Sequence, residues 1–344
     1  MKALIKRNPT IGLSLDNVPT PECGKSDLLI RVLKTSLCGT DLQLYRWSAE
    51  FDATIPLPVI IGHEFVGEIV EIGSNVKGFS LGQYVSGETS VHCGDCQHCI
   101  SGHHCRCENI TYTGVTRPGA FAEFIALPAR AVWPHAPDIE LETATLFEPL
   151  GNVVHALSYV DLSKKTVLIL GASPEGAIAA AICRHAGACD VVVVDEDLKK
   201  LRLALAMGAS HVVNVKEDTV DETRLGLGLE EGFDVTLELS GNRDAYPLVF
   251  NHTRQKGEVV LAGIPDSSLE MDWRSVIFKQ LNIKGVHGRA VPETWQQMSA
   301  LIEGGLDLSP IISKRLHYTE FEEGFNLLAQ GWPGKVIMDW GVKK

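Results

Sequence analysis

The sequence predicts an α/β protein that combines a β-rich domain with a doubly wound parallel sheet. Its 344 residues are enough for two domains of the usual size, roughly 150 residues each. Short extended runs separated by prolines dominate residues 1–146, whereas short apolar runs alternate with helical segments over residues 147–288. The first pattern is typical of a barrel or sandwich, and the second of parallel strands joined by helices.

The β-rich segment is indicated by its strands and turns. Leu28–Leu33 and Phe65–Ile72 are rich in the apolar residues that favour strands. Prolines interrupt the segment throughout, and no long amphipathic helix is evident in it.

The second segment alternates strands with helices. Thr166–Leu170 is a continuous apolar run, as expected of a strand buried on both faces of a parallel sheet. A helix is predicted over Pro174–His185, because proline suits the first helical position and the following alanines favour a helix. Another helix is predicted near Leu198–Met207, ended by Gly208. The remaining predicted strands are Asp190–Val194, His211–Val215, Phe233–Leu239, Glu258–Gly263 and Asn282–Val286. Six strands with helices between them indicate a doubly wound sheet.

The last stretch, residues 289–344, is too short for a third domain. It contains one predicted helix, Thr294–Glu303, and a strand near Val336–Met338. We therefore expect residues 1–146 and 289–344 to form one discontinuous domain, with residues 147–288 inserted as the second.

Composition excludes several classes of protein. The 31 Lys and Arg residues against 43 Asp and Glu give a formal net charge of −12, which repels phosphate backbones and disfavours nucleic-acid binding. No apolar run approaches the roughly 18 residues of a membrane span, and the N-terminal apolar stretch is too short for a signal peptide. We therefore expect a cytoplasmic protein. Because five of the nine cysteines lie between residues 93 and 107, metal binding is favoured over disulfides.

The cysteine cluster has the spacing of a metal site. Cys93, Cys96 and Cys99 follow a C-x2-C-x2-C pattern, and Cys107 supplies a fourth thiolate. Four thiolates leave zinc no open position, so we expect a structural site. Spacing alone also permits an iron–sulfur cluster, and Cys105 competes with Cys107 as the fourth ligand.

A second, dispersed set combines thiolate, imidazole and carboxylate. Cys38 lies in Cys-Gly-Thr-Asp, and His63 and Glu64 lie in Gly-His-Glu-Phe-Val-Gly. Such a mixed ligand set suits a catalytic zinc that keeps room for a substrate oxygen.

A glycine-rich turn after the strand Thr166–Leu170 approximates the dinucleotide fingerprint G-x-G-x-x-G. Gly171 and Gly176 match it, and Ser173 replaces the second glycine. Asp195 ends the next strand, where a carboxylate can accept hydrogen bonds from a ribose and repel a 2′-phosphate. Together these residues predict NAD rather than NADP.

Taken together, these residues resemble the zinc-dependent medium-chain alcohol and polyol dehydrogenases. His63-Glu64 after Gly62, followed by Gly67, Gly73 and Val76, match that family's zinc signature, and the cysteine lobe and Phe147-Glu148-Pro149-Leu150 also fit. The resemblance implies a GroES-like catalytic domain, a Rossmann domain, one catalytic and one structural zinc, NAD and a homotetramer.

The resemblance also implies roles for individual residues. Cys38, His63 and Glu64 correspond to catalytic-zinc ligands, Glu148 to an acidic position at or beside the metal, and Thr40 to the hydroxyl that passes the substrate proton onward. The implied cofactor contacts are Gly171, Ser173, Glu175, Gly176, Asp195, Lys200, Ala262, Gly263, Ile264, Val286 and His287.

Within the family, the chain most resembles the enzymes that oxidise L-threonine, and this implies oxidation of threonine or a close amino alcohol. Three positions depart from that pattern: Gln43 replaces a histidine at the end of the expected proton relay, Ala290 replaces an acidic residue, and His287 replaces an aromatic one. A glutamine cannot exchange a proton near neutral pH. A polyol or amino sugar is therefore the alternative substrate, and a zinc-stabilised binding protein without catalysis is the alternative from another class.

Overall fold

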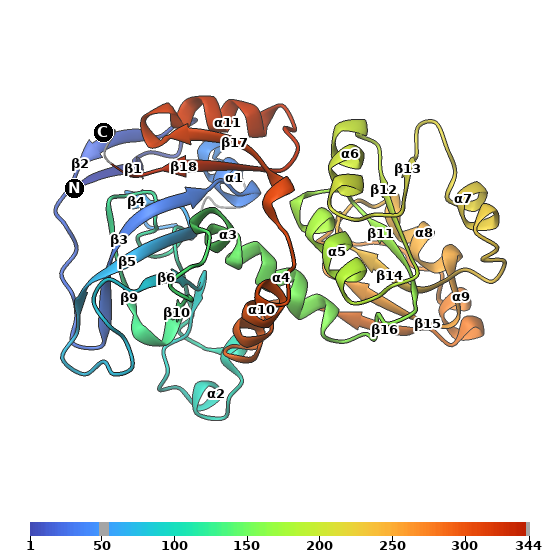
Figure 1. Cartoon of the computed structure of the whole chain (residues 1–344), viewed down its shortest axis with the longest axis horizontal. Helices are drawn as coiled ribbons and strands as arrows, with labels where there is room; N and C mark the ends of the chain where they lie inside the picture. Colours follow the sequence, from blue (N-terminus) through green and yellow to red (C-terminus); the bar gives the residue numbers. More distant parts are fainter. Residues whose placement is uncertain (48–54, 342–344) are drawn as a thin grey trace. The chain divides into compact units, whose positions relative to one another are not determined.

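The structure is a computed structural model that describes residues 1–47 and 55–341 and divides into two compact units (Figure 1). The first unit contains Met1–Pro149, Ala290–Trp295 and Ile312–Lys344, and the second contains Leu150–Arg289 and Gln296–Ile311. This division assigns residues 296–311 to the second unit, unlike the predicted domain boundaries, which stay a prediction. Within the described residues, no helix is long and apolar enough to cross a membrane.

The first unit is built on antiparallel strands. Its largest sheet has the order β10-β6-β5-β3-β18-β17, with β9 also paired to β3; smaller sheets have the orders β2-β1-β4 and β7-β8. Among the strands that the structure describes in this unit, β17 and β18 are the one pair that runs parallel. The strands are β1 (Lys2–Lys6), β2 (Ser14–Asn17), β3 (Asp27–Ser36), β4 (Val59–Ile60), β5 (Glu64–Ile72), β6 (Tyr84–Gly87), β7 (Ser90–Val91), β8 (Thr111–Tyr112), β9 (Phe124–Pro128), β10 (Val132–Pro134), β17 (Ile312–His317) and β18 (Lys335–Asp339).

Strand β3 is the central strand of this unit, because it pairs with β5, β9 and β18. Leu28, Ile30 and Val32 of β3 are buried in the apolar core with Phe65 of β5 and Phe121. The predicted strands Leu28–Leu33 and Phe65–Ile72 are confirmed and lie side by side.

The second unit is a six-stranded parallel sheet with the order β13-β12-β11-β14-β15-β16. Its strands are β11 (Thr166–Leu170), β12 (Asp190–Asp195), β13 (His211–Asn214), β14 (Phe233–Glu238), β15 (Thr253–Leu261) and β16 (Asn282–Gly285). All six predicted strands are confirmed. Strand β15 begins five residues before the predicted start at Glu258, because its first residues are polar and do not form an apolar run. The apolar run of β11 is buried on both faces, because helices cover both faces of the sheet in a doubly wound fold.

Helices flank both units. They are α1 (Gly39–Arg46), α2 (Gln97–Ile100), α3 (Leu141–Thr145), α4 (Phe147–Leu157), α5 (Pro174–His185), α6 (Leu198–Ala206), α7 (Val220–Gly226), α8 (Ala245–His252), α9 (Trp273–Lys279), α10 (Glu293–Glu303) and α11 (Phe321–Ala329).

The prediction of a single helix in residues 289–344 is wrong, since α11 follows α10. An interior glycine, Gly324, lowers helix propensity there. Phe321 and Phe325 nevertheless lie one turn apart and are both buried, so packing against the core stabilises the helix.

Candidate functional site

The candidate metal centre of the first unit consists of Cys38, His63 and Glu64. One ligand atom from each residue lies within 4.8 Å of the others, and His63 and Glu64 are buried. Cys38 follows the end of β3, and Glu64 opens β5 directly opposite Ser36. The antiparallel register of the two strands therefore brings together ligands that are distant in sequence.

A glycine is required immediately before these ligands. Gly62 has φ +92°, a conformation that L side chains rarely adopt, and a Cβ there would lie 2.1 Å from the ring of Phe121. Gly62 thus lets the chain turn tightly against the core and point His63 toward Cys38.

Asp41, on the first turn of α1, supports both Cys38 and His63. Its Oδ2 accepts a hydrogen bond from the Cys38 backbone N–H at 2.9 Å, and its Oδ1 lies 3.6 Å from His63 Nδ1. Burial lowers the pKa of His63, but Asp41 and then Cys38 outweigh it and raise that pKa well above its ordinary value. A carboxylate behind a histidine fixes the ring for metal binding at its other nitrogen.

Glu64 is held by two donors in the protein. Lys335 Nζ on β18 donates to Glu64 Oε1 at 2.5 Å, and Ser36 Oγ donates to Oε2. Burial raises the pKa of Glu64 to about 7, and Lys335 opposes that rise. Both charged side chains are at most 2% exposed.

Glu148 lies on the first turn of α4 and is also buried. Thr89 Oγ1 donates a hydrogen bond to Glu148 Oε1 at 2.8 Å. Glu148 is close enough to raise the pKa values of Asp41, His63 and Glu64. The structure therefore groups Glu148 with the candidate metal centre.

These residues fit a catalytic zinc. Sulfur, nitrogen and oxygen donors form a ligand set that zinc accepts, and three protein ligands leave a position for substrate. Among the described residues, His63 Nδ1 and Asp41 Oδ1 are buried without a hydrogen-bond partner. Metal binding at the other ring nitrogen of His63 would keep a proton on Nδ1, where it faces the Asp41 carboxylate.

The second candidate metal site is formed by Cys93, Cys96, Cys99 and Cys107, whose sulfur atoms lie within 4.8 Å of one another. Cys93 Sγ is 3.5 Å from Cys107 Sγ and 3.8 Å from Cys99 Sγ, so these thiols are close but not disulfide-bonded. Cys105 is exposed and lies outside the group. The structure thus places Cys107, the first of the two candidates, with the other three.

Backbone donors prepare this lobe to hold thiolates. The N–H of Cys93 donates to Cys107 Sγ at 3.2 Å, and the N–H of Cys96 donates to Cys93 Sγ at 3.4 Å. Backbone donors at Cys99 and Glu108 lower the pKa of Cys96 to about 6, whereas burial raises the pKa of Cys99 to about 12. Four converging thiols with amide donors fit a closed, structural zinc site.

The glycine-rich turn of the second unit explains its departure from the fingerprint. Gly171 has φ +104°, and a Cβ on Gly176 would lie 2.0 Å from the Gly171 carbonyl oxygen, so both glycines are required. Ser173 is the N-cap of α5: its Oγ accepts from the Gly176 N–H at 3.4 Å and donates to Glu175 at 3.0 Å. Serine at this position therefore begins the helix.

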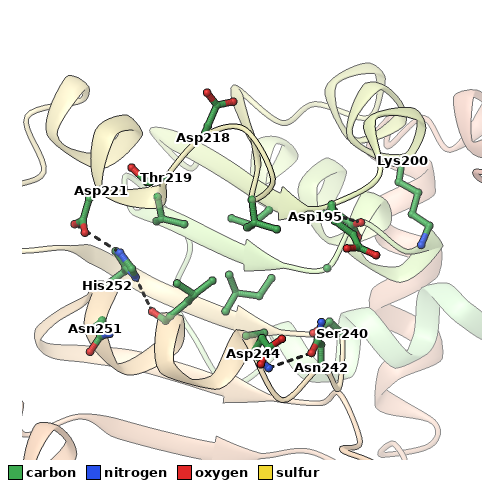
Figure 2. Close-up of a pocket in the computed structure, with 18 residues that line it drawn as sticks. Asp195, Lys200, Asp218, Thr219, Asp221, Ser240, Asn242, Asp244, Asn251 and His252 are labelled. Carbon is green, nitrogen blue, oxygen red and sulfur yellow. Dashed lines mark hydrogen bonds and ion pairs between the residues drawn. The ribbon is translucent and has the colours of Figure 1, made fainter.

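Asp195 closes the same turn. Its Oδ2 accepts from the Ala172 N–H at 2.8 Å, and its Oδ1 accepts from the N–H groups of Glu196 and Asp197. A pocket of about 730 Å³ opens beside it at the carboxyl ends of the strands, where doubly wound sheets bind ligands. Figure 2 shows Asp195 and Lys200 at one end of this pocket and Asp221 with His252 at the other.

The comparisons with known proteins agree with this geometry. Residues 24–138 match the family model of the alcohol dehydrogenase GroES-like domain, and residues 174–304 match that of the zinc-binding dehydrogenases. The chain is 45% identical to an L-threonine 3-dehydrogenase of Pectobacterium carotovorum over 99% of both chains, and 46% identical to one of Solibacter usitatus over 99% of this chain and 100% of that one.

This chain belongs to the zinc-binding alcohol dehydrogenase family. The resemblance stated from the zinc signature is thereby confirmed, as are the GroES-like and Rossmann folds. A structure described as a zinc-binding dehydrogenase of Sinorhizobium meliloti 1021, bound to NADP, has a TM-score of 0.90 and 28% identity, and covers 98% of each chain. Alcohol dehydrogenase TADH from Thermus sp. ATN1 has a TM-score of 0.89 and 25% identity, with 98% of this chain and 99% of that one covered.

Not every predicted site residue of this zinc-binding dehydrogenase lies at a described site. Thr40 and Gln43 lie three residues apart on α1, the helix that also carries Asp41, and Gln43 is exposed. The pocket is lined by Gly171, Asp195 and Lys200, but not by Ser173, Glu175 or Gly176. Ala262, Gly263 and Ile264 follow β15, and Val286 and His287 follow β16; these five residues lie outside the pocket lining.

Sequence analysis did not identify several residues that lie at the candidate metal centre or line the pocket. Asp41 lies in the quoted Cys-Gly-Thr-Asp segment and could have been found from its position in the first turn of a helix. Ser240 and Asn242 follow the carboxyl end of β14 and line the pocket, and the rule for doubly wound sheets could have indicated them. Lys335 gave no local signal.

Proposed function

We propose that the chain is an NAD-dependent zinc enzyme that oxidises L-threonine to 2-amino-3-oxobutanoate. The observation that carries the proposal is the 45% identity to an L-threonine 3-dehydrogenase, over 99% of this chain and 99% of that one. The grouping of Cys38, His63 and Glu64, with the Glu148 carboxyl group near enough to raise the pKa of Glu64, supports chemistry at a hydroxyl group.

Charge at the site supports an amino-alcohol substrate. Asp41 and Glu64 are buried carboxyl groups that each interact with buried Glu148, and the cations beside them are Lys335, paired with Glu64, and His63, which faces Asp41. An additional positive group is favourable beside so many acids. The substrate ammonium supplies it, and Glu148, held in place by Thr89, is its acceptor.

The roles of the chain's own residues follow. When bound, zinc supplies a Lewis acid that lowers the pKa of the substrate hydroxyl, and NAD supplies a hydride acceptor. Cys38, His63 and Glu64 would hold the metal, and Asp41 would keep the His63 ring oriented. The Thr40 hydroxyl accepts the substrate proton and passes it on, and Asp195 accepts hydrogen bonds from the ribose.

One observation favours a second candidate, a polyol or amino-sugar dehydrogenase. Gln43 is exposed on the same helix as Thr40 and stands where the resemblance implies a histidine. A relay that ends at an amide has no group to release the proton near neutral pH. A different substrate with a different proton exit would account for that.

The test is direct. The purified protein is supplied with zinc and NAD, and NADH absorbance is followed with L-threonine, L-serine, polyols and amino sugars. Turnover that is highest on L-threonine supports the proposal. Turnover confined to polyols or amino sugars supports the second candidate, and reduction of NADP in preference to NAD contradicts the cofactor assignment.

A cytoplasmic homo-oligomer, and specifically a homotetramer, is part of the proposal. Strand β16 is the edge of its sheet, and it is mostly exposed. The neighbouring helix α9 exposes Trp273, Ile277 and Phe278, the last at 71%. Edge strands and exposed apolar faces favour self-association. Light scattering after gel filtration measures the mass, and a monomer would contradict the assignment.

A further inference from the structure

Lys335 is a charged side chain buried inside the first unit, where apolar residues would be expected. It is the first residue of β18, and it is 2% exposed. Lysine is almost never fully buried unless it is paired, because its charge loses hydration. Its Nζ lies 2.5 Å from Glu64 Oε1, a residue of the candidate metal centre.

The strand register brings Lys335 to the whole centre. Ser36 of β3 stands opposite Glu64 on one side and Ile337 of β18 on the other. The Leu37 N–H donates to the Val336 carbonyl, so β18 continues alongside the chain that leads into Cys38. Lys335 thus lies among the acids and the thiol of the centre, and it is not part of a surface pair.

Glu64 therefore has two competing sets of partners. Its Oε1 is bound to Lys335 and its Oε2 to Ser36, yet a carboxylate oxygen of Glu64 also lies within 4.8 Å of the other two ligand atoms. A carboxylate oxygen that is paired with an ammonium is a poorer donor to a metal, and the ammonium repels a nearby cation. Both effects act in the same direction.

We propose that Lys335 is a positioning residue that holds Glu64 as a weak, exchangeable ligand and thereby limits how tightly the centre retains its metal. Cys38, His63 and Glu64 would otherwise form a tighter site. The inference rests on the proposed function only in treating these three residues as the metal centre. It requires neither a particular substrate nor turnover.

The test measures metal retention. The protein is reconstituted with Co²⁺, and its release to a coloured chelator is followed at both sites. In Lys335→Met, which keeps the length of the side chain and removes the charge, we expect the Cys38 site to release cobalt about tenfold more slowly, because no ammonium competes with the metal for Glu64. The visible cobalt spectrum of that site should also change, because Glu64 then binds the metal more firmly.

Three matched variants separate this role from a general loss of structure. Lys335→Arg keeps the charge and should release cobalt as the wild type does. Lys335→Met combined with Glu64→Gln should release it as Glu64→Gln alone does, since the effect of Lys335 acts through Glu64. The cysteine lobe, as the internal reference, should release its cobalt at the same rate in every variant.

The outcomes are distinct. If Lys335→Met releases cobalt from the Cys38 site as fast as the wild type or faster, the inference is wrong but the metal centre stands. The same holds if Lys335→Met slows release equally when Glu64 has already been replaced with Gln. If Lys335→Met does not fold, Lys335→Gln replaces it, because its amide can still donate to Glu64 without a charge. Release from Lys335→Gln as fast as from Lys335→Arg then overturns the inference. A wild type that binds cobalt only at the cysteine lobe overturns both the inference and the proposed metal centre.

Discussion

Asp41 and His63 face each other inside the first unit, with Asp41 Oδ1 3.6 Å from His63 Nδ1, and neither atom has a hydrogen-bond partner among the described residues. The pair connects the helix that follows Cys38 to the strand that carries Glu64. It gives the imidazole one fixed direction, so the metal site is oriented by a residue that does not belong to the ligand set.

Replacing Asp41 with asparagine should weaken metal binding at the Cys38 site. The amide keeps the shape but removes the charge that stabilises His63, and losses of roughly 10–100-fold in affinity are typical for such partners. Zinc content after dialysis against a graded chelator series measures it. Asp339→Asn, at a half-exposed aspartate of β18, is the control and should retain wild-type content. Equal retention by both variants would contradict the role of Asp41.

Replacing Cys96 with serine should remove one zinc equivalent and destabilise residues 90–110. The elements of the lobe are short, with four residues in α2 and two each in β7 and β8, so we expect the metal to supply its stability, on the order of 10 kcal/mol for such sites. Metal analysis and limited proteolysis are the measurements. Cys105→Ser, at the exposed cysteine of the same lobe, should lose neither metal nor protease resistance. A Cys105→Ser protein that loses zinc as Cys96→Ser does would show that the assignment of Cys107 is wrong.

Replacing Asp195 with alanine should reduce the preference for NAD over NADP. The carboxylate accepts three backbone N–H groups at the turn and retains lone pairs for ribose hydroxyls. Its loss removes those acceptors and the repulsion of a 2′-phosphate. Michaelis constants for both cofactors are compared, and that for NAD should rise more. Asp190→Ala, at the opposite end of β12, should leave the ratio unchanged.

Replacing Gln43 with histidine should raise turnover on L-threonine, most visibly below pH 8, if the substrate is threonine and only the proton exit differs. The gain is roughly tenfold or more, since a positioned acid–base group contributes about 10²–10⁴. Rates of both proteins on threonine and on a polyol panel across pH provide the measurement. Full wild-type turnover on threonine with no gain in the variant would mean that position 43 does not end the relay.

Acid should destabilise the first unit through His135. Burial lowers the pKa of His135 to about 4, and its Nε2 lies 2.7 Å from Ser86 Oγ. The unfolded chain therefore binds the proton first. The stability contributed by the neutral ring is fully present above about pH 6.5 and is lost as the pH falls toward 4. The loss is about 3 kcal/mol, at roughly 1.4 kcal/mol per unit.

Urea unfolding of the wild type and of His135→Gln at pH 7 and pH 4.5 tests this. The variant should lose less stability over that interval. His185→Gln, at an exposed histidine, is the control and should follow the wild type. Parallel losses in all three proteins would exclude His135 as the cause.

Much of the second unit could be predicted from local sequence, and the reason is physical. The strand Thr166–Leu170 and the helix Pro174–His185 are found where the sequence places them, because buried parallel strands and a proline-started, alanine-rich helix carry strong local signals. Helix α11 was missed, since its stability comes from the burial of Phe321 and Phe325 and not from propensity.

The site was predictable where function imposes spacing and unpredictable where the fold supplies the partner. Cys93, Cys96 and Cys99 lie within seven residues, and this spacing predicts a metal site. The choice between Cys105 and Cys107 needed their positions in space. Lys335 and Glu64 are paired only through the order of strands β5, β3 and β18, which no short pattern records.

Ser173 has a consequence for how relatives of this chain are found. Gly171 is required by its φ of +104° and Gly176 by the close Gly171 carbonyl oxygen, whereas the middle position is Ser173, which caps a helix. A search that demands three glycines would discard this chain, although its turn has the required backbone. Searches that accept serine at the middle position while holding the outer glycines invariant would recover such dehydrogenases from sequence collections.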